Sequence, residues 1–292
     1  MEMPAETHAA PPPARRAAAL TWIAGGLRLL SRLSPAASSR VAFELFRTPR
    51  RFRVPAREEA LLGGAEPFEV RLSPSTSVKA WRWGEGPAVL LMHGWEGRGS
   101  QLAALAGPIA GAGFSAVTFD APGHGSSSGR TSSLPHFAWA LRGVAAAAGE
   151  VRAVVAHSLG CAAATLAIRD GMPVERAVFI APPLHPSDYT RQFGAMFGLP
   201  EKVIDGLRAR IEERFLRKWE DYSLAEMAPR MSAALLVVHD RHDAETLWTA
   251  GARLAELWPG ARLLTTEGLG HRRILRDPAV VQTVADFLKA TS

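Results

Sequence analysis

The sequence predicts an α/β protein with a mostly parallel central sheet, helices flanking the sheet and a small helical cap inserted into it. From Phe68 onward, short apolar runs alternate with helix-length segments. These runs are almost continuous in Val, Leu and Ala, which is typical of strands covered on both faces. Two of them, ending at Ala181 and beginning at Ala234, are separated by about fifty residues. That distance is too long for a simple crossover and predicts an insertion.

Eight strands are expected. The first two, FEVRL (68–72) and VKAWRW (78–83), form a pair joined by a polar turn at 73–75. Helix-length connections between most of the later strands predict right-handed crossovers in a parallel sheet. The six later strands are AVLLMH (88–93), SAVTFD (115–120), VRAVVA (151–156), AVFIA (177–181), ALLVVH (234–239) and ARLLTT (261–266).

The insertion, at about 184–232, has the pattern of a helical cap. Apolar residues recur there at helical spacing, and charged residues fill the other face of the helix. Four further apolar residues precede this helix, at 193, 196, 197 and 199. The apolar residues at helical spacing are Ile204, Leu207, Ile211, Phe215 and Trp219.

The basic charge is concentrated at the N-terminal end. The 292 residues carry 34 Lys and Arg against 28 Asp and Glu, a formal charge of +6. Residues 1–59 hold ten Arg against five acids, which leaves 24 basic and 23 acidic residues in the remaining 233. The sequence pI near 10.2 therefore says little about the substrate. The basic segment has few aromatic residues and no nucleic-acid-reading motif, so no nucleic-acid partner is expected.

The N-terminal region is expected to contain a disordered tail at 1–18 and a helical extension at 19–64, before a main domain at 65–292. Within the extension, an amphipathic helix over about 20–34 is expected to pack on the main domain. A peripheral membrane contact by the extension is the alternative.

Targeting features are weak. Arg15, Arg16 and the apolar stretch 17–27 resemble the start of a secretory signal, but no convincing cleavage site follows. The stretch is too short to span a bilayer and is interrupted by Arg28 and Arg32, so no transmembrane segment is expected. The lone Cys161 excludes an internal disulfide and is interpreted as a small packing residue. A cytoplasmic location is favoured, with secretion as the minor alternative.

The segment AHSLG (156–160) predicts a nucleophile. It lies between the buried strand VRAVVA and an Ala-rich helical segment. A serine in a sharp strand-to-helix turn needs small residues two before and two after it, and Ala156 and Gly160 meet that need. The helix N-terminus behind Ser158 offers free N–H groups to a developing oxyanion.

A serine nucleophile needs a histidine base and a carboxylate that fixes the tautomer of that histidine. Of nine histidines, only His271 lies beyond the strand ALLVVH and the acid-bearing turn that follows it. That turn, HDRHDAE, offers Asp240, Asp243 and Glu245. Asp243 is chosen because it can project from the loop toward His271. Asp240, which adjoins the strand, is interpreted as a turn residue and His242 as an exposed neighbour.

Two loops complete the predicted site. In MHGWEG (92–97), the backbone N–H of Trp95 is expected to form an oxyanion hole together with that of Leu159. His93 is interpreted as structural. The loop FDAPGHGSSSG (119–129) is also interpreted as structural, with Asp120 accepting backbone N–H groups. It lacks the patterns that bind phosphate or dinucleotides.

These motifs resemble those of the α/β-hydrolase superfamily, in particular its single-domain esterase-like members with a helical cap. The resemblance covers about residues 65–290 and rests on HGW, DAPGHGSSSG, AHSLG, HDRHD and GLGH, in the order of the family. The sequence departs from the usual pattern at Ala156 and Asp240, where the family usually has glycine. Neither departure removes a catalytic group.

The resemblance implies two-step acyl transfer through Ser158, His271 and Asp243, without a cofactor or metal. The expected substrate is a small-molecule carboxylic ester with a small or medium apolar acyl group. A thioesterase, an acyltransferase or a carbon–carbon hydrolase is the alternative on the same triad, and a noncatalytic binding module is a rival of a different class. Nothing in the sequence fixes the oligomeric state.

Overall fold

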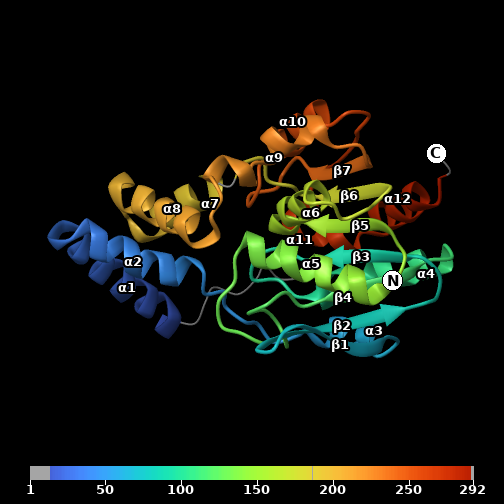
Figure 1. Ribbon diagram of the computed structural model, residues 1–292, viewed down its shortest axis with the longest axis horizontal. Coiled ribbons are helices and arrows are strands. Elements are labelled where there is room, and N and C mark those ends of the chain that lie inside the picture. Colours follow the sequence, from blue (N-terminus) through green and yellow to red (C-terminus); the bar gives the residue numbers. More distant parts are fainter. Residues whose placement is uncertain (1–13, 186, 291–292) are drawn as a thin grey trace, which may run out of the picture. The chain divides into compact units, whose positions relative to one another are not determined.

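The computed structural model describes residues 14–185 and 187–290, with side chains from residue 20 onward (Figure 1). The predicted tail at 1–18 therefore lies outside the described residues up to residue 13, and a helix begins at Ala14. The chain divides into two compact units. The helical unit contains the chain up to Phe46 together with Ser187–Arg214, and the sheet unit contains Arg47–Pro186 and the chain from Phe215.

The sheet unit is built on one eight-stranded sheet in the described part of the chain, with the order β1-β2-β4-β3-β5-β6-β7-β8. β1 pairs antiparallel with β2, β2 pairs antiparallel with β4, and all other neighbours are parallel. The predicted mostly parallel α/β architecture is thus confirmed. The strands are β1 (Glu66–Ser73), β2 (Thr76–Trp83), β3 (Ala88–Met92), β4 (Ser115–Phe119), β5 (Val151–His157), β6 (Arg176–Ile180), β7 (Ala234–Asp240) and β8 (Arg262–Thr266).

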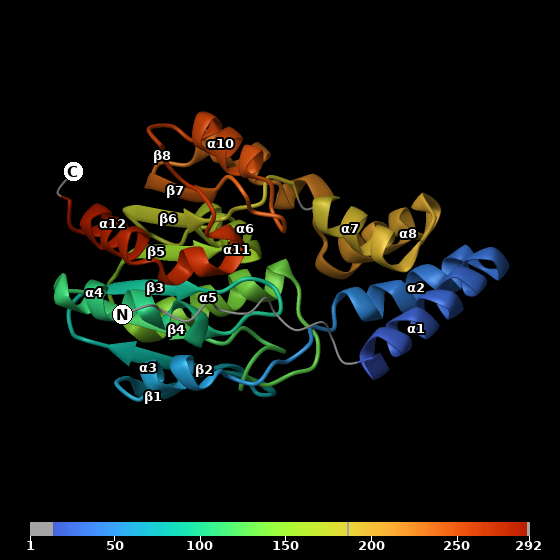
Figure 2. The ribbon, with the colours of Figure 1, turned by 180° about the vertical axis from the view of Figure 1, so that it is seen from behind.

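Helices cover both faces of this sheet, because the central strands are apolar on both sides. Every residue of β3, β4 and β6 is buried. Val89, Val155 and Val238 face a core closed by α4 (Ala103–Gly111) and α12 (Pro278–Lys289), which lie on the near side in Figure 2.

The opposite face is covered by α5 (Leu134–Ala148), α6 (Leu159–Arg169) and α10 (Trp248–Leu257). Two of the helices have side-chain caps that satisfy free N–H groups at their first turn. Ser133 accepts the His136 N–H at the start of α5, and Asp277 accepts two N–H groups at the start of α12. The remaining short elements are α3 (Ala56–Leu62), α9 (Leu224–Met227), α11 (Gly270–Arg273) and the 3-10 turns Gly99–Leu102, Trp219–Tyr222, Ala228–Arg230 and Ile274–Arg276.

The helical unit contains α1 (Ala14–Leu33), α2 (Pro35–Phe46), α7 (Ser187–Phe197) and α8 (Glu201–Phe215). Ala24, Leu27 and Phe197 form a small core. At Gly206 a Cβ would come within 2.8 Å of the Ser39 Cβ, so only glycine lets α8 approach α2 so closely. No helix among the described residues is long and apolar enough to cross a membrane.

The N-terminal helices pack against helices of the insertion, which lies within the range 65–292 expected for the main domain. α1 contacts α2 and α7, and Phe46 packs edge-on against Phe193 at 5.3 Å between ring centroids. The inserted helices thus share a core with the N-terminal helices. Local periodicity shows which face of a helix is apolar but not which distant segment covers it.

Candidate active site

Ser158 occupies a sharp turn between β5 and α6. Its backbone has φ 53° and ψ −125°, a conformation that non-glycine residues adopt rarely and at a cost in strain. The turn requires Gly160, because a Cβ there would lie 2.6 Å from the His93 carbonyl oxygen. The sequence around AHSLG thus forms the strained turn that its spacing predicts, with Ser158 directly before the first residue of α6.

Asp243 and His271 are brought together by the loops that follow β7 and β8. Asp243 Oδ2 lies 2.7 Å from His271 Nδ1, and both side chains are buried. Asp243 Oδ1 accepts the N–H groups of Glu245 at 2.8 Å and Thr246 at 2.9 Å. Burial raises the pKa of Asp243, but hydrogen bonds from His239, His271 and the Thr246 N–H outweigh it and hold this pKa well below its ordinary value. Asp243 is therefore an anion at neutral pH.

Asp240 shapes the loop that carries His271. Its Oδ1 accepts the His242 N–H at 2.9 Å. Its Oδ2 accepts the Thr266 hydroxyl at 2.8 Å and the Leu269 N–H at 2.9 Å. Asp240 thus bonds the backbone, as expected of a turn residue, and it fixes the chain two residues before His271.

His157 is a contact that the sequence analysis did not assign. Its ring centroid lies 4.6 Å from that of His271, and its Nε2 donates to the His271 carbonyl oxygen at 2.9 Å. Burial holds the pKa of His157 well below its ordinary value, so the ring is neutral. This hydrogen bond ties His157, the residue before the predicted nucleophile, to the backbone of the predicted base. The sequence signal for this role is the position of His157 directly before Ser158 in the segment AHSLG.

His239 is a second unassigned neighbour of the site. It is fully buried, and its Nε2 lies 3.0 Å from the Thr246 carbonyl oxygen and 3.5 Å from Asp243 Oδ2. The carbonyl can only accept, so Nε2 carries the proton. His239 packs against Gly251, where a Cβ would lie 2.2 Å from Nδ1. Asp243 is thus flanked by two imidazoles, of which the sequence analysis assigned only His271.

The loop after β3 lies against Ser158, since a Cβ at Gly94 would come within 2.9 Å of the Ser158 Cβ. Among the described residues, the backbone N–H groups of Trp95 and Leu159 have no hydrogen-bond acceptor. Free N–H groups beside a strained serine are the arrangement that an oxyanion hole requires.

Two buried histidines hold this loop in place. The Ala121 N–H donates to His93 Nε2 at 2.9 Å, and the Glu96 N–H donates to His124 Nε2 at 3.1 Å. In each ring Nδ1 faces a carbonyl oxygen, so each ring is neutral with its proton on Nδ1. Burial lowers the pKa of His93 to about 4 and that of His124 to about 3. The structure thus gives His93 the structural role that was expected.

One buried ion pair and several hydrogen bonds to the backbone support the loops after β3 and β4. Arg98 donates twice to Glu58, at 2.8 Å each, and the Ser100 hydroxyl donates to Glu58 at 2.7 Å. Asp120 accepts the N–H groups of Gly99 and Ser126, each at 2.7 Å. The Arg51 guanidinium binds four carbonyl oxygens of the loop after β4, those of Gly123, Gly125, Ser127 and Gly129.

All predicted site residues lie in the sheet unit, at the carboxyl ends of its parallel strands. Ser158 follows β5, Trp95 follows β3, Asp243 follows β7 and His271 follows β8. Cys161 is buried on α6 and not disulfide-bonded, and its Sγ lies 3.3 Å from the Ala156 carbonyl oxygen. No group of three or more potential metal ligands occurs among the described residues.

This sheet, with a strained serine and a buried Asp–His pair at its carboxyl edge, defines the protein as an α/β hydrolase. More particularly, the chain belongs to the Hydrolase_4 family, described as serine aminopeptidase, S33, whose model matches residues 86–286. The resemblance inferred from the motifs is thereby confirmed.

Solved structures support the fold. The chain is similar to an esterase from Pyrococcus furiosus, with 17% identity, a TM-score of 0.63 and coverage of 82% of this chain and 98% of that one. An esterase from Exiguobacterium antarcticum gives 15%, 0.60, 77% and 100% for the same quantities. A bacterial membrane phospholipase A, a virulence factor, gives 18%, 0.60, 94% and 96%. No curated protein matches the sequence.

Proposed function

We propose that the protein is a carboxylic-ester hydrolase that acts on small or medium apolar acyl groups through Ser158, His271 and Asp243. The observation that carries the proposal is the 2.7 Å hydrogen bond between Asp243 and His271, next to a serine at φ 53°. A carboxylate on Nδ1 leaves Nε2 free to accept a proton. This arrangement favours catalysis over a binding module, since binding alone requires neither the strained serine nor the oriented base.

In the first half of the reaction, the Ser158 hydroxyl attacks the ester carbonyl carbon while His271 Nε2 takes its proton. The carbonyl oxygen becomes an oxyanion, which accepts the N–H groups of Trp95 and Leu159. Collapse of this intermediate breaks the carbon–oxygen bond to the alcohol, which leaves with the proton from His271. Asp243 stabilises the imidazolium that exists between these two transfers.

In the second half, water attacks the acyl group on Ser158 while His271 again takes a proton. The acid leaves, and Ser158 regains its proton from His271. The Asp240 and His157 contacts keep the loop of His271 fixed throughout, because a displacement of about 1 Å at a catalytic group can cost on the order of 100-fold in rate.

Ester hydrolysis is placed first because several structural neighbours are named as esterases, lipases or a phospholipase. A thioesterase, an acyltransferase or a carbon–carbon hydrolase would use the same residues. The family description adds a peptidase substrate to the comparison. A cytoplasmic location is part of the proposal, because the lone thiol of Cys161 is buried and no disulfide constrains the described residues.

The proposal is tested with p-nitrophenyl esters of increasing acyl length, the matching thioesters and an aminoacyl p-nitroanilide, together with a fluorophosphonate probe. We expect turnover of the esters to exceed that of the other classes and the probe to label Ser158. Ser158→Ala should abolish labelling and lower kcat by about 10⁶-fold. Ser75→Ala, at an exposed turn, is the matched control and should behave as the unmodified protein.

Labelling at another serine, or turnover that persists in Ser158→Ala, would overturn the mechanism. Faster turnover of the thioester or the anilide would keep the triad but replace the substrate class. Absence of both labelling and turnover in a folded protein would favour the noncatalytic module.

A further inference from the structure

Helix α1 of the helical unit has an apolar face on the side away from its packing. Ala24, Leu27 and Ser31 are buried on one side of the helix, where it meets α2 and α7. On the other side, Trp22 is 81% exposed, Leu29 59% and Leu33 76%. Single exposed apolar side chains are common on protein surfaces, but a continuous row of large ones is unusual.

These three side chains do form a row. At 3.6 residues per turn, positions 22, 29 and 33 fall within about 40° of one another around the helix axis and about 180° from the buried face. Gly25 and Gly26 lie between Trp22 and Leu29 in the chain and are exposed, and nothing would contact a Cβ at either of them. We refer to Trp22, Leu29 and Leu33 as the α1 stripe. Because Gly25 and Gly26 have no side chains, they leave the Trp22 and Leu29 side chains unobstructed.

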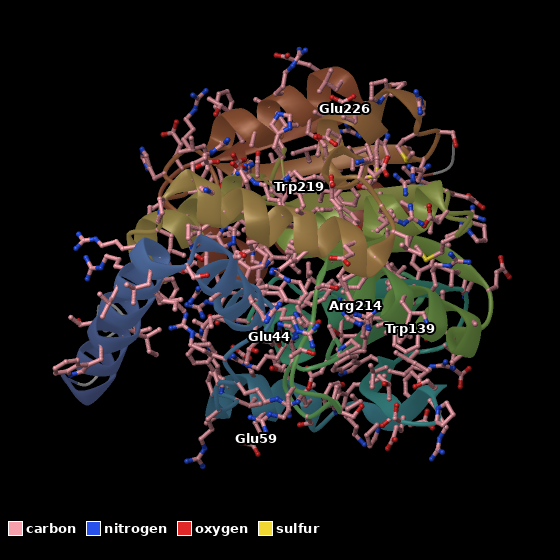
Figure 3. All side chains as sticks on the ribbon, turned by 60° about the vertical axis from the view of Figure 1, so that its left-hand side comes forward. Glu44, Glu59, Trp139, Arg214, Trp219 and Glu226 are labelled. Carbon is pink, nitrogen blue, oxygen red and sulfur yellow. The ribbon has the colours of Figure 1, made fainter. Side chains whose placement is uncertain are left out.

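The charge of the same helices is strongly positive. α1 and α2 contain five arginines, at positions 15, 16, 28, 32 and 40, and a single acidic residue, Glu44, which is labelled in Figure 3. Arg28, Arg32 and Arg40 are exposed. In contrast, α7 and α8 of the same unit contain five basic and five acidic residues. The positive charge of the helical unit thus belongs to α1, which carries the stripe, and to α2.

An exposed row of Trp and Leu together with arginines is the chemistry that binds an anionic bilayer surface. Trp is favoured at the boundary between headgroups and acyl chains, and each nearby Arg gains from the negative surface potential. α1 is not apolar enough to span a bilayer, so the matching geometry is a helix lying in the plane of the interface.

We propose that α1 docks the protein on an anionic phospholipid membrane, with the α1 stripe inserted among the acyl chains and Arg32 and Arg40 close to the phosphates. The charge pattern favours a lipid surface over a protein partner. The charged residues of α1 are all positive, and an anionic bilayer offers a uniformly negative surface. Docking of this kind does not depend on the hydrolase reaction, so it is measured separately from catalysis.

The test is co-sedimentation of the full chain with vesicles of phosphatidylcholine alone, and with vesicles in which about a third of the lipid is phosphatidylglycerol. Binding should require the anionic lipid and should weaken as salt rises, because screening shortens the reach of the arginine charges. The variant Trp22→Ser/Leu29→Ser/Leu33→Ser should lose on the order of 100-fold in affinity. Arg32→Gln/Arg40→Gln should lose about tenfold or more.

The matched control replaces exposed leucines outside the stripe. Leu216 is 89% exposed and Leu247 70%, and Leu216→Ser/Leu247→Ser should bind as the unmodified protein does. Because the stripe is exposed, the triple variant should keep its helix content and thermal midpoint.

A second measurement needs no disruptive variant. Brominated phosphatidylcholine in the anionic vesicles should quench tryptophan fluorescence, and Trp22→Phe should bind normally but lose most of the quenching. Trp139→Phe, at the other exposed tryptophan among the described residues, should keep it.

Equal vesicle binding by the unmodified protein and the triple variant would overturn the proposal, as would binding without anionic lipid. Equally decisive would be a dimer in light scattering that the triple variant converts to a monomer, with no vesicle binding by either. That result would assign the stripe to a second copy of the chain.

Discussion

The carboxyl end of the sheet and the α1–α2 pair differ in how their side chains are buried and bonded. At the sheet, buried polar groups such as Asp120, Asp240 and Asp243 are satisfied by several named donors each. In α1, the core consists of a few small apolar contacts and the largest side chain, Trp22, is exposed. The first region fixes atoms in place, whereas the second leaves apolar surface exposed.

The difference matches the functions proposed for the two regions. Acyl transfer requires donors and acceptors held within a fraction of an ångström, which a buried, fully bonded network provides. A docking surface requires exposed area and charge, which need little internal structure. Substitutions in the first region should therefore change chemistry and stability, and substitutions on the exposed surface of the second should change neither.

Of the comparisons that follow, the one with the largest expected effect concerns Asp243, the acid of the proposed triad. Asp243→Asn should lower kcat by about 10⁴-fold, because an amide can hold His271 in the wrong tautomer. Glu245→Gln, two residues on and partly exposed, should change kcat by less than about threefold, which is within the usual effect of a surface substitution. Steady-state kinetics on the preferred ester compares the two. Similar losses in both variants would mean that the turn as a whole, and not the Asp243–His271 pair, matters.

Acid should destabilise the sheet unit through its buried neutral histidines. Burial lowers the pKa of His93 to about 4, that of His124 to about 3 and that of His157 well below its ordinary value, while an unfolded histidine titrates near 6.5. Below about pH 6.5 the unfolded chain therefore binds more protons than the folded one. The free energy of unfolding then decreases as pH is lowered, by up to about 1.4 kcal/mol per pH unit for each histidine.

Urea unfolding at pH 7, 6 and 5 measures this slope. His124→Gln should reduce it by about a third, whereas His242→Gln, at an exposed position, should leave it unchanged. The lowered pKa of Asp243 acts with the same sign at lower pH, since its contribution is lost as pH falls from the unfolded value near 3.9. A free energy of unfolding that stays constant from pH 7 to 5 would contradict the neutral state of these rings.

The buried ion pair beside the loop after β3 should contribute less to stability than the histidines together but more than any exposed pair. Glu58→Gln leaves the Arg98 guanidinium, about one-tenth exposed, without its carboxylate partner, and should cost about 3 kcal/mol. Glu256→Gln breaks the exposed pair with Arg253 and should cost less than about 0.5 kcal/mol. Chemical denaturation at one pH compares the two variants. Equal costs would show that burial of the pair does not matter.

The smallest expected effect on stability comes from replacing one glycine in each unit by alanine. Gly206→Ala would place a Cβ 2.8 Å from the Ser39 Cβ and should destabilise the contact between α8 and α2 by about 1–2 kcal/mol. Gly107→Ala, with open space around it in α4, should stabilise by about 0.5–1 kcal/mol. Hydrogen exchange reports each unit by itself. Faster exchange confined to the helical unit is expected for Gly206→Ala, and uniform exchange would show that the units unfold together.

Local patterns predicted much of the fold and of the site. Each of the eight strands lies within two residues of an expected apolar run. The signal is strongest for β3, β4 and β6, which are buried throughout, because a strand buried on both faces has to be apolar throughout. The position of Asp243 in the turn favours it over Asp240, and it is Asp243 that contacts His271. The small residues around Ser158 predict its sharp turn, and the close approach of Gly160 to the His93 carbonyl explains that spacing.

The contacts missed are those between segments far apart in the chain. His157 donates to the backbone of His271, and Arg98 meets Glu58, but no periodicity links these positions. The same holds for α1, whose apolar residues could be assigned to a helix but not to a partner. Composition and spacing describe segments that are close in the chain. These pairings arise only when the folded sheet brings the ends of distant loops together.

The sequence by itself determined the order of the strands, the choice of the serine, acid and histidine of the proposed triad, and the placement of the positive charge near the N-terminus. These are properties of short segments, governed by burial and turn chemistry. Only the tertiary structure decided that α1 and α2 share a core with α7, that His157 and His239 flank the Asp–His pair, and that Trp22, Leu29 and Leu33 are left exposed. These features depend on which distant surfaces meet, and side-chain packing settles that after the local elements have formed.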